Sequence, residues 1–222
     1  MPVQSKALNW ENENSNHGVH LEPTDISYYL AHKWNVEGHK TVLDIGSGLG
    51  RHSIFFAKQG FSVSAMDISE YGADFLKKWA YSEKLDIDVK LGDMLSLDFP
   101  DQYFNCVFAY HAISHTDSKG IKKVISEIER VLKCNGEAYL SFISKASNFY
   151  LVSDAERVDE NTIICNQEPE IGVPHYYADL HDIVRLLQNF NIECIKHTEY
   201  CDYANLNNSI KNCHYYVNAS LK

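Results

Sequence analysis

The chain has 222 residues, with 20 basic against 30 acidic side chains and a formal net charge of −10. This length suits one α/β domain with a full apolar core, and the lack of a basic cluster disfavours nucleic acid as a partner. Six cysteines without a C-x-x-C pair, and no signal peptide or apolar run of membrane-spanning length, favour a cytoplasmic protein with reduced thiols and no membrane contact.

Residues 1–38 predict a polar arm followed by a helix. The arm, residues 1–20, contains His17 and His20, but no third ligand lies nearby and we expect no metal there. A helix then begins near Asp25, and its apolar positions fall on one stripe before Gly38 ends it.

Residues 41–50 predict a strand, a tight turn and the start of a helix. Val42, Leu43 and Ile45 form an apolar run, and helical periodicity begins at Arg51. Between them lie three glycines, which permit positive φ and the close approach of a ligand. These glycines are Gly46, Gly48 and Gly50.

The spacing of this turn separates it from other glycine-rich turns. It reads G-x-G-x-G, whereas dinucleotide sites use G-x-G-x-x-G and phosphate loops use G-x-x-x-x-G-K-[ST]. Asp44 would repel a pyrophosphate but suits an ammonium or sulfonium group. The stretch resembles motif I of the class I S-adenosylmethionine (SAM)-dependent methyltransferases. That resemblance implies a SAM site containing Asp44, Gly46, Ser47, Gly48 and Gly50.

The second predicted strand, residues 61–67, ends at Asp67. Parallel nucleotide-binding sheets place the acid that accepts from ribose hydroxyls at this point. A helix cap at Asp67 or Ser69 is the alternative. We assign Asp67 and the following Ile68 to the cofactor site.

The third predicted strand spans residues 87–94 and also ends in an acid. In the family that the chain resembles, an acid here accepts from the adenine amino group and the next apolar side chain covers the ring. Asp93 and Met94 match those roles, although Gly92 and Asp93 could also form only a turn.

A strongly apolar fourth strand, residues 104–110, leads into a loop with two histidines. Ligands bind beyond the carboxyl ends of strands in open α/β sheets, so this loop should line the methyl-transfer cavity, with Tyr110 beside the cofactor. His111 and His115 could contact substrate, act as acid or base, or make structural hydrogen bonds. A metal pair at i and i+4 is a further alternative, but no partner carboxylate is evident.

Residues 120–133 predict an amphipathic helix, closed by Cys134-Asn135-Gly136 with one of the last two residues in a left-handed conformation. Residues 137–143 predict the fifth strand. This segment resembles the R-V-L-K-P-G-G segment of the same family, with Cys134 and Asn135 in place of Pro and Gly.

Residues 144–178 interrupt the regular alternation and predict an irregular insertion on the substrate side, with a possible short strand at 162–165. Residues 173–177, Val-Pro-His-Tyr-Tyr, form a candidate substrate lip. A rigid turn into the next helix is an equally weighted alternative. His175 is the third histidine that could serve as a base.

The last part of the chain, residues 179–222, predicts a helix over 180–189 and two successive strands over 191–200 and 214–221. Because no helix separates them, these strands should form an antiparallel hairpin at the sheet edge. We therefore expect a doubly wound, Rossmann-like sheet of seven mostly parallel strands in one domain. Its parts are an N-terminal lid (1–38), a SAM-binding core (39–143), the insertion (144–178) and the final helix and hairpin (179–222).

The function implied by the resemblance is methyl transfer from SAM to an O, N or S atom of a small molecule, leaving S-adenosylhomocysteine (SAH). In-line displacement needs mainly aligned reactants and excluded water, and one proton must be removed. His111, His115 and His175 are the candidate bases, and no metal is expected.

Three other functions stay open at this point. The chain could be a SAM-binding regulatory or partner-binding module without turnover. An NAD(P)-dependent oxidoreductase is disfavoured by Asp44 and the glycine spacing, and a macromolecular methyltransferase by the lack of basic patches or an N-P-P-Y motif. Either a monomer or a homodimer is compatible with the sequence.

Overall fold

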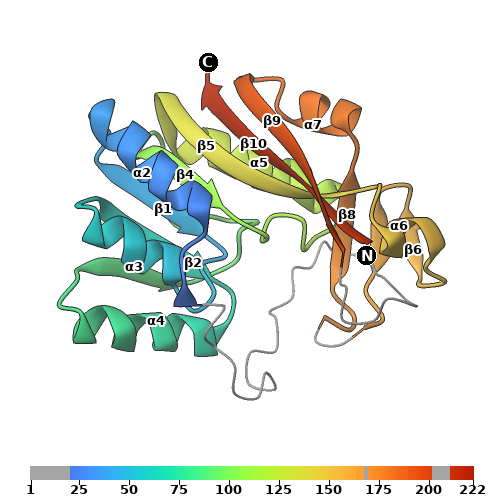
Figure 1. Ribbon diagram of the computed structural model, residues 1–222, viewed down its shortest axis with the longest axis horizontal. Helices are drawn as coiled ribbons and strands as arrows, with labels where there is room; N and C mark the ends of the chain where they lie inside the picture. Colours follow the sequence, from blue (N-terminus) through green and yellow to red (C-terminus); the bar gives the residue numbers. More distant parts are fainter. Residues whose placement is uncertain (1–20, 168–169, 202–210) are drawn as a thin grey trace.

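The computed structural model describes residues 21–167, 170–201 and 211–222, which form one twisted sheet with helices on both faces (Figure 1). The first five strands along the chain pair in parallel with one another, whereas the C-terminal strand runs antiparallel to both of its neighbours. The mostly parallel, Rossmann-like sheet and its antiparallel C-terminal hairpin are therefore as predicted. In spatial order the strands are β3 (Ile87–Leu91), β2 (Ser62–Asp67), β1 (Thr41–Ile45), β4 (Phe104–Ala109), β5 (Leu132–Ser144), β10 (Lys211–Leu221) and β9 (Phe190–Cys201).

The insertion is more regular than predicted and adds three strands, β6 (Arg157–Asp159), β7 (Thr162–Ile164) and β8 (Pro174–Ala178). Only the strand near 162–164 was predicted. Ile143 of β5 pairs with His214 on one edge and with Tyr177 on the other. Strand β8 therefore pairs with the same side of β5 as β4 does, but nearer the carboxyl end of β5. With β6, β7 and β8 included, the full sheet has ten strands.

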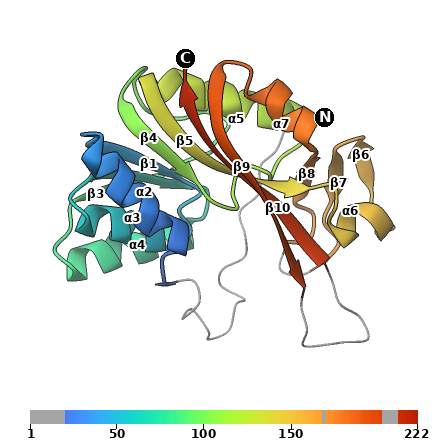
Figure 2. The ribbon, with the colours of Figure 1, turned by 45° about the horizontal axis from the view of Figure 1, so that its top comes forward.

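Helices cover the two faces separately, as Figure 2 shows. Side chains alternate along β1, so Val42 packs toward one face while Leu43 and Ile45 pack toward the other. The first face carries α2 (Asp25–Val36), α3 (Arg51–Lys58) and α4 (Glu70–Ser82), and the second carries α5 (Ser118–Val131) and α7 (Leu180–Leu186). A short helix, α6 (Asn148–Val152), lies in the insertion.

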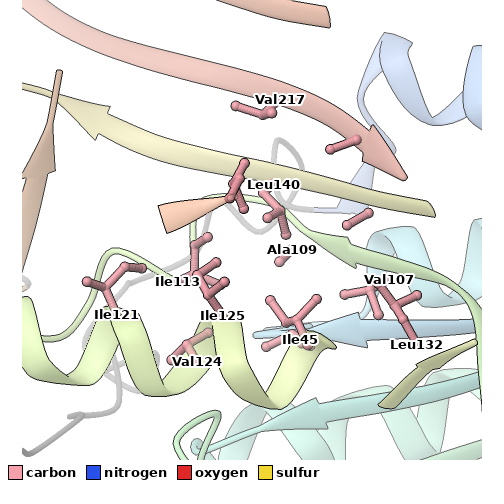
Figure 3. Packing of buried hydrophobic residues seen from close by; sticks show 14 of the residues in the cluster. Ile45, Val107, Ala109, Ile113, Ile121, Val124, Ile125, Leu132, Leu140 and Val217 are labelled. Carbon is pink, nitrogen blue, oxygen red and sulfur yellow. The ribbon is translucent and has the colours of Figure 1, made fainter. Parts of the chain in front are cut away.

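The apolar stripe of α5 forms the centre of the larger core cluster (Figure 3). Ile121, Val124 and Ile125 are almost fully buried against strands β1, β4 and β5. Asp117 caps the helix by accepting from the Lys119 and Gly120 N–H groups. The helix ends at Val131, earlier than predicted, because the chain turns directly into β5, where Asn135 adopts a φ of +59°.

Helix α2 is part of the core. Leu30 and Trp34 are fully buried, and Trp34 Nε1 donates to Glu137 Oε2 over 2.8 Å. Lys33 pairs with the same carboxylate and so ties the helix to β5. The arm, residues 1–20, lies outside the described residues, and its role as a lid stays a prediction. No helix in the described ranges has the length and apolar character needed to cross a membrane.

Candidate active site

The glycine turn follows β1 and is held to the end of β2 by backbone hydrogen bonds. The Gly46 and Ser47 N–H groups both donate to the Met66 carbonyl, over 2.8 and 3.1 Å. Gly46 has a φ of +68°, and a Cβ at this position would clash with Ala112 Cβ. Glycine is therefore required here both for the backbone conformation and for close packing against the loop after β4.

Asp67 links the turn to the start of α4. Its Oδ2 accepts from the Gly48 N–H over 2.7 Å, and its Oδ1 accepts from the Ser69 N–H over 2.8 Å. Ser69 is the helix cap, accepting from the Gly72 N–H. Burial raises the pKa of Asp67, although these backbone donors oppose the shift. Each carboxylate oxygen still has acceptor capacity for a second donor, as a ribose diol would need.

Asp44 lies beneath the glycine turn. Its side chain accepts from Ser53 Oγ over 2.5 Å, and the residue is 2 % exposed. Burial raises the pKa of Asp44 to about 7, with Asp67 adding to the shift and Ser53 and Arg51 opposing it. A cation bound at the turn would favour the ionised carboxylate.

The turn also contains a buried polar atom that fits a ligand. Ser47 Oγ has no hydrogen-bond partner among the described residues. Buried hydroxyls are normally paired, so this atom marks a place where a polar group of a ligand can bind. The turn, Ser47 and Asp67 therefore fit the amino acid and ribose parts of SAM.

Asp93 and Met94 lie next to this region. Asp93 Oδ1 accepts from the Leu95 N–H over 2.9 Å, which is the turn foreseen as the alternative. The Gly92 N–H donates to the Asp67 carbonyl and brings the end of β3 to the end of β2. Met94 packs against the core, while Ile68 is 37 % exposed. Their contacts with adenine stay a prediction.

Tyr110 and His111 begin the loop after β4. Their rings stack with centroids 4.2 Å apart, and the Arg51 guanidinium lies 5.7 Å from the centre of the Tyr110 ring. His111 has a φ of +54°, a conformation uncommon for a residue with a side chain, and its N–H donates to Ser141 Oγ. The structure thus holds His111 in a fixed, strained position at the carboxyl end of the sheet.

The His111 imidazole is part of an aromatic network in which Tyr216 is buried, Tyr110 and His214 are half-buried, and His111 itself is exposed. Its Nε2 lies 2.8 Å from the Tyr216 hydroxyl, which is also near the hydroxyls of Tyr110 and Tyr200. The ring stacks on His214 with centroids 4.2 Å apart. Burial, with help from His214 and Arg51, lowers the pKa of His111 to about 3. The imidazole is therefore neutral at physiological pH.

His115 belongs to a second group and does not form an i, i+4 pair with His111, because residues 110–117 are not helical. Its ring stacks on His175 with centroids 5.0 Å apart, and Glu170 contacts both imidazoles. Glu170 Oε1 is 3.4 Å from His115 Nε2, and Glu170 Oε2 is 3.2 Å from His175 Nε2. Burial and the neighbouring His175 lower the pKa of His115 to about 4. Burial opposes the charge of Glu170, but the two imidazoles outweigh it and lower its pKa.

The predicted substrate lip at residues 173–177 is wrong in its local structure, and so is the alternative of a turn. Most of this stretch is strand β8, and Val173, Tyr176 and Tyr177 are at most 5 % exposed. The strand is buried because it pairs with both β5 and β7. His175 reaches the site from inside the sheet.

Glu170, His214 and Tyr216 were missed by sequence reasoning. Glu170 lies in the insertion, where no periodicity predicts which side chains meet. His214 and Tyr216 are two residues apart on β10 and so share a face. Because β10 is antiparallel to β5, its first residues meet the end of β5. The predicted edge hairpin could have identified this pair.

Comparison with known proteins agrees with this geometry. A family model described as methyltransferase domain matches residues 42–136. A sterol 24-C-methyltransferase from Gibberella zeae is 36 % identical over 114 residues, 49 % of this chain and 29 % of that protein. One from Eremothecium gossypii is 34 % identical over 156 residues, 68 % of this chain and 40 % of that protein. The chain thus matches less than half the length of these curated relatives.

Solved structures share the fold. A SAM-dependent methyltransferase from Methanosarcina mazei is similar with a TM-score of 0.69 and 22 % identity, covering 90 % of this chain and 99 % of that one. The PH0226 protein from Pyrococcus horikoshii gives 0.68 and 21 %, covering 95 % and 94 %. Together with the match to the family model and the glycine turn with its strand-end acids, these findings identify residues 42–136 as a methyltransferase domain with the fold of class I SAM-dependent methyltransferases, a family whose cofactor is SAM.

Proposed function

We propose that this chain transfers the methyl group of SAM to an O, N or S atom of a small molecule bound beside His111. One observation carries the proposal: Ala112, the residue after His111, packs directly on Gly46 of the cofactor turn. The cofactor turn and the strained histidine are therefore adjacent at the carboxyl ends of neighbouring strands β1 and β4. When bound, SAM supplies a methyl group on a cationic sulfur, which is a good leaving group.

Different residues of the chain would bind the cofactor and take up the proton. Asp67 and Ser47 would bind the polar parts of the cofactor, and Asp44 would favour its positive charge from beneath the turn. His111, which is neutral at physiological pH, would take the proton that the acceptor atom loses. Tyr216 would orient the imidazole through its contact with Nε2.

A heteroatom acceptor is favoured by the polar groups that surround His111. The neighbouring His214 and Tyr200 also offer ring nitrogens and hydroxyls rather than an apolar wall. A carbon acceptor on a sterol is the second candidate, because the curated relatives are sterol 24-C-methyltransferases by name. We further propose a cytoplasmic location, which is supported by four cysteines that form no disulfide, Cys106, Cys134, Cys165 and Cys194.

Turnover tests the proposal directly. The protein is incubated with radiolabelled SAM and a panel of small alcohols, phenols, amines and thiols, together with an unsaturated sterol. We expect label in a heteroatom acceptor, and His111→Gln should lower turnover at least tenfold while SAH affinity stays within about twofold. Label only in the sterol would favour the second candidate. SAH binding without any labelled product would instead favour a regulatory module.

A further inference from the structure

Two of the three predicted bases, His115 and His175, share a carboxylate and form a second group close enough to His111 to affect its pKa. They come from the loop after β4 and from β8, and Glu170 comes from the turn before β8. One nitrogen or oxygen atom from each of the three residues lies within 4.8 Å of the other two. Two imidazoles and one carboxylate are a common ligand set for transition metals.

We propose that His115, Glu170 and His175 form a binding site for a divalent transition metal, and that Zn²⁺ is the best match. The site is new relative to the sequence, which showed no carboxylate near these histidines. The part that we assign to this metal in catalysis rests on the proposed function.

The distances fit a metal site. Bonds of about 2.0–2.1 Å at tetrahedral angles place two ligand atoms roughly 3.3 Å apart. The separations of 3.4 Å between His115 Nε2 and Glu170 Oε1 and of 3.2 Å between His175 Nε2 and Glu170 Oε2 match this spacing. Only small side-chain movements are needed to place one ion among the three atoms.

His175 supplies an independent observation. The residue is 5 % exposed, and its Nε2 is buried and makes no hydrogen bond of good geometry with any residue in the described ranges. Such an atom costs free energy unless something binds it. A metal ion between this nitrogen and the nearby carboxylate would supply the missing partner.

The backbone holds the two histidines in place. The Tyr176 N–H donates to the Ser114 carbonyl over 2.8 Å, so the chain neighbours of His175 and His115 are bonded to each other. Ser114 Oγ also accepts from the Ile143 N–H of β5. A site whose ligands sit on fixed elements binds metal without a large ordering cost.

Glu170 is held by its own turn. Its carbonyl accepts from the Val173 N–H, and the Val173 carbonyl accepts from the Cys165 N–H at the end of β7. The carboxylate is 27 % exposed and the His115 side chain 17 %, which leaves an entry path for an ion.

The other group with suitable ligand atoms does not carry the same inference. Glu37, His39 and Glu137 also lie close together. However, Lys33 pairs with both carboxylates, and Trp34 donates to Glu137. A cation there would compete with an ammonium group that is already in place.

Three protein ligands leave a fourth position open, as in catalytic zinc sites. On the proposed function, this position would bind the acceptor heteroatom, and the metal would lower the pKa of its proton. The metal would thus make the acceptor a better nucleophile, while His111 receives the proton. Metal binding itself needs neither SAM nor the acceptor.

Titration of the metal-free full chain with Co²⁺ tests the site, with visible absorption and calorimetry as readouts. We expect one Co²⁺ per chain, a spectrum without a thiolate charge-transfer band, and displacement by Zn²⁺. Glu170→Gln and His175→Gln should each weaken binding at least tenfold, about 1.4 kcal/mol. Glu160→Gln is the matched control, because this glutamate lies in the same insertion and its side chain is 86 % exposed.

Circular dichroism checks the fold of each variant, and His115→Gln replaces His175→Gln if the latter does not fold. The absence of Co²⁺ binding, equal affinity in the Glu170→Gln variant, or a thiolate band from one of the cysteines would overturn the site. SAH titration in the same samples separates the two proposals. SAH binding without metal binding removes only the metal site, whereas metal binding without SAH binding removes only the proposed function.

Discussion

The glycine turn after β1 and the histidine groups beyond β4 both lie at the carboxyl ends of the parallel strands, but they are assembled differently. Asp44, Gly46 and Asp67 come from one strand–turn–helix unit and the strand that follows it. The histidine groups combine the loop after β4, the insertion and the start of β10. A contiguous motif can be read from its spacing, whereas a site built from distant segments depends on the sheet order.

Burial also acts on these two regions in opposite directions. It raises the pKa of the carboxyl groups at the turn and lowers the pKa of His111 and His115. In both regions the neutral form is favoured, because the charged form loses its hydration. A cationic ligand would restore charge to the carboxylates but not to the imidazoles. The turn is thus suited to a charged cofactor and the histidines to neutral ligation or proton transfer.

The largest expected effect concerns Asp44 and pH. Its pKa is about 7 in the folded chain against 3.8 ordinarily, so the folded state keeps a proton that the unfolded state has lost. The wild type should therefore lose stability as the pH rises from about 4 through 7. Asp44→Asn should remove this loss, with a ceiling of about 4 kcal/mol above pH 7, since each pKa unit is about 1.4 kcal/mol.

Urea unfolding of both proteins at several pH values measures this difference. Asp74→Asn is the control, because its side chain is 58 % exposed on α4 and should leave the pH profile unchanged. Identical profiles for wild type and Asp44→Asn would show that Asp44 is not destabilised by burial. The Asn variant should also bind SAH more weakly, which separates stability from cofactor binding.

The next effect concerns the contact between the two regions. Gly46→Ala should lower the free energy of unfolding by about 2–4 kcal/mol, because it adds a clash with Ala112 to the strain of a positive φ. Gly38→Ala isolates the strain, since Gly38 has a φ of +81° and open space around its Cβ position. The double variant Gly46→Ala/Ala112→Gly should recover the part due to the clash. Equal losses for Gly46→Ala and Gly38→Ala would mean that the two regions are not packed together.

The smallest effect concerns the histidine network. Tyr216→Phe removes the hydroxyl 2.8 Å from His111 Nε2 and should cost about 1 kcal/mol of stability while leaving SAH affinity within about twofold. Tyr215→Phe, at the next position on β10, is the control. A loss of SAH affinity in Tyr216→Phe alone would place this hydroxyl in the cofactor site. The cofactor turn and the histidine network would then not be separate regions.

Local patterns predicted the parts of the molecule that depend on nearby residues. The stripe of α5, a left-handed residue at 135 or 136, found at Asn135, and the edge hairpin all follow from periodicity or turn chemistry. Strand β8 did not, because its partner β5 lies far away in the sequence. Strand β6 pairs with the adjacent β7 but has only three residues, too few to show alternation. For the same reason Glu170 could not be placed beside His115 and His175 from the sequence.

Calorimetric titration with SAH tests the central claim, that the glycine turn and the strand-end acids form a SAM site. The wild type should bind one SAH per chain and give no heat with NADH. Asp67→Ala should weaken SAH binding more than tenfold, or by about 1.4 kcal/mol, because it removes the carboxylate at the end of β2 that is assigned to the ribose hydroxyls. An unchanged affinity in this variant, or binding of NADH in place of SAH, would contradict the account.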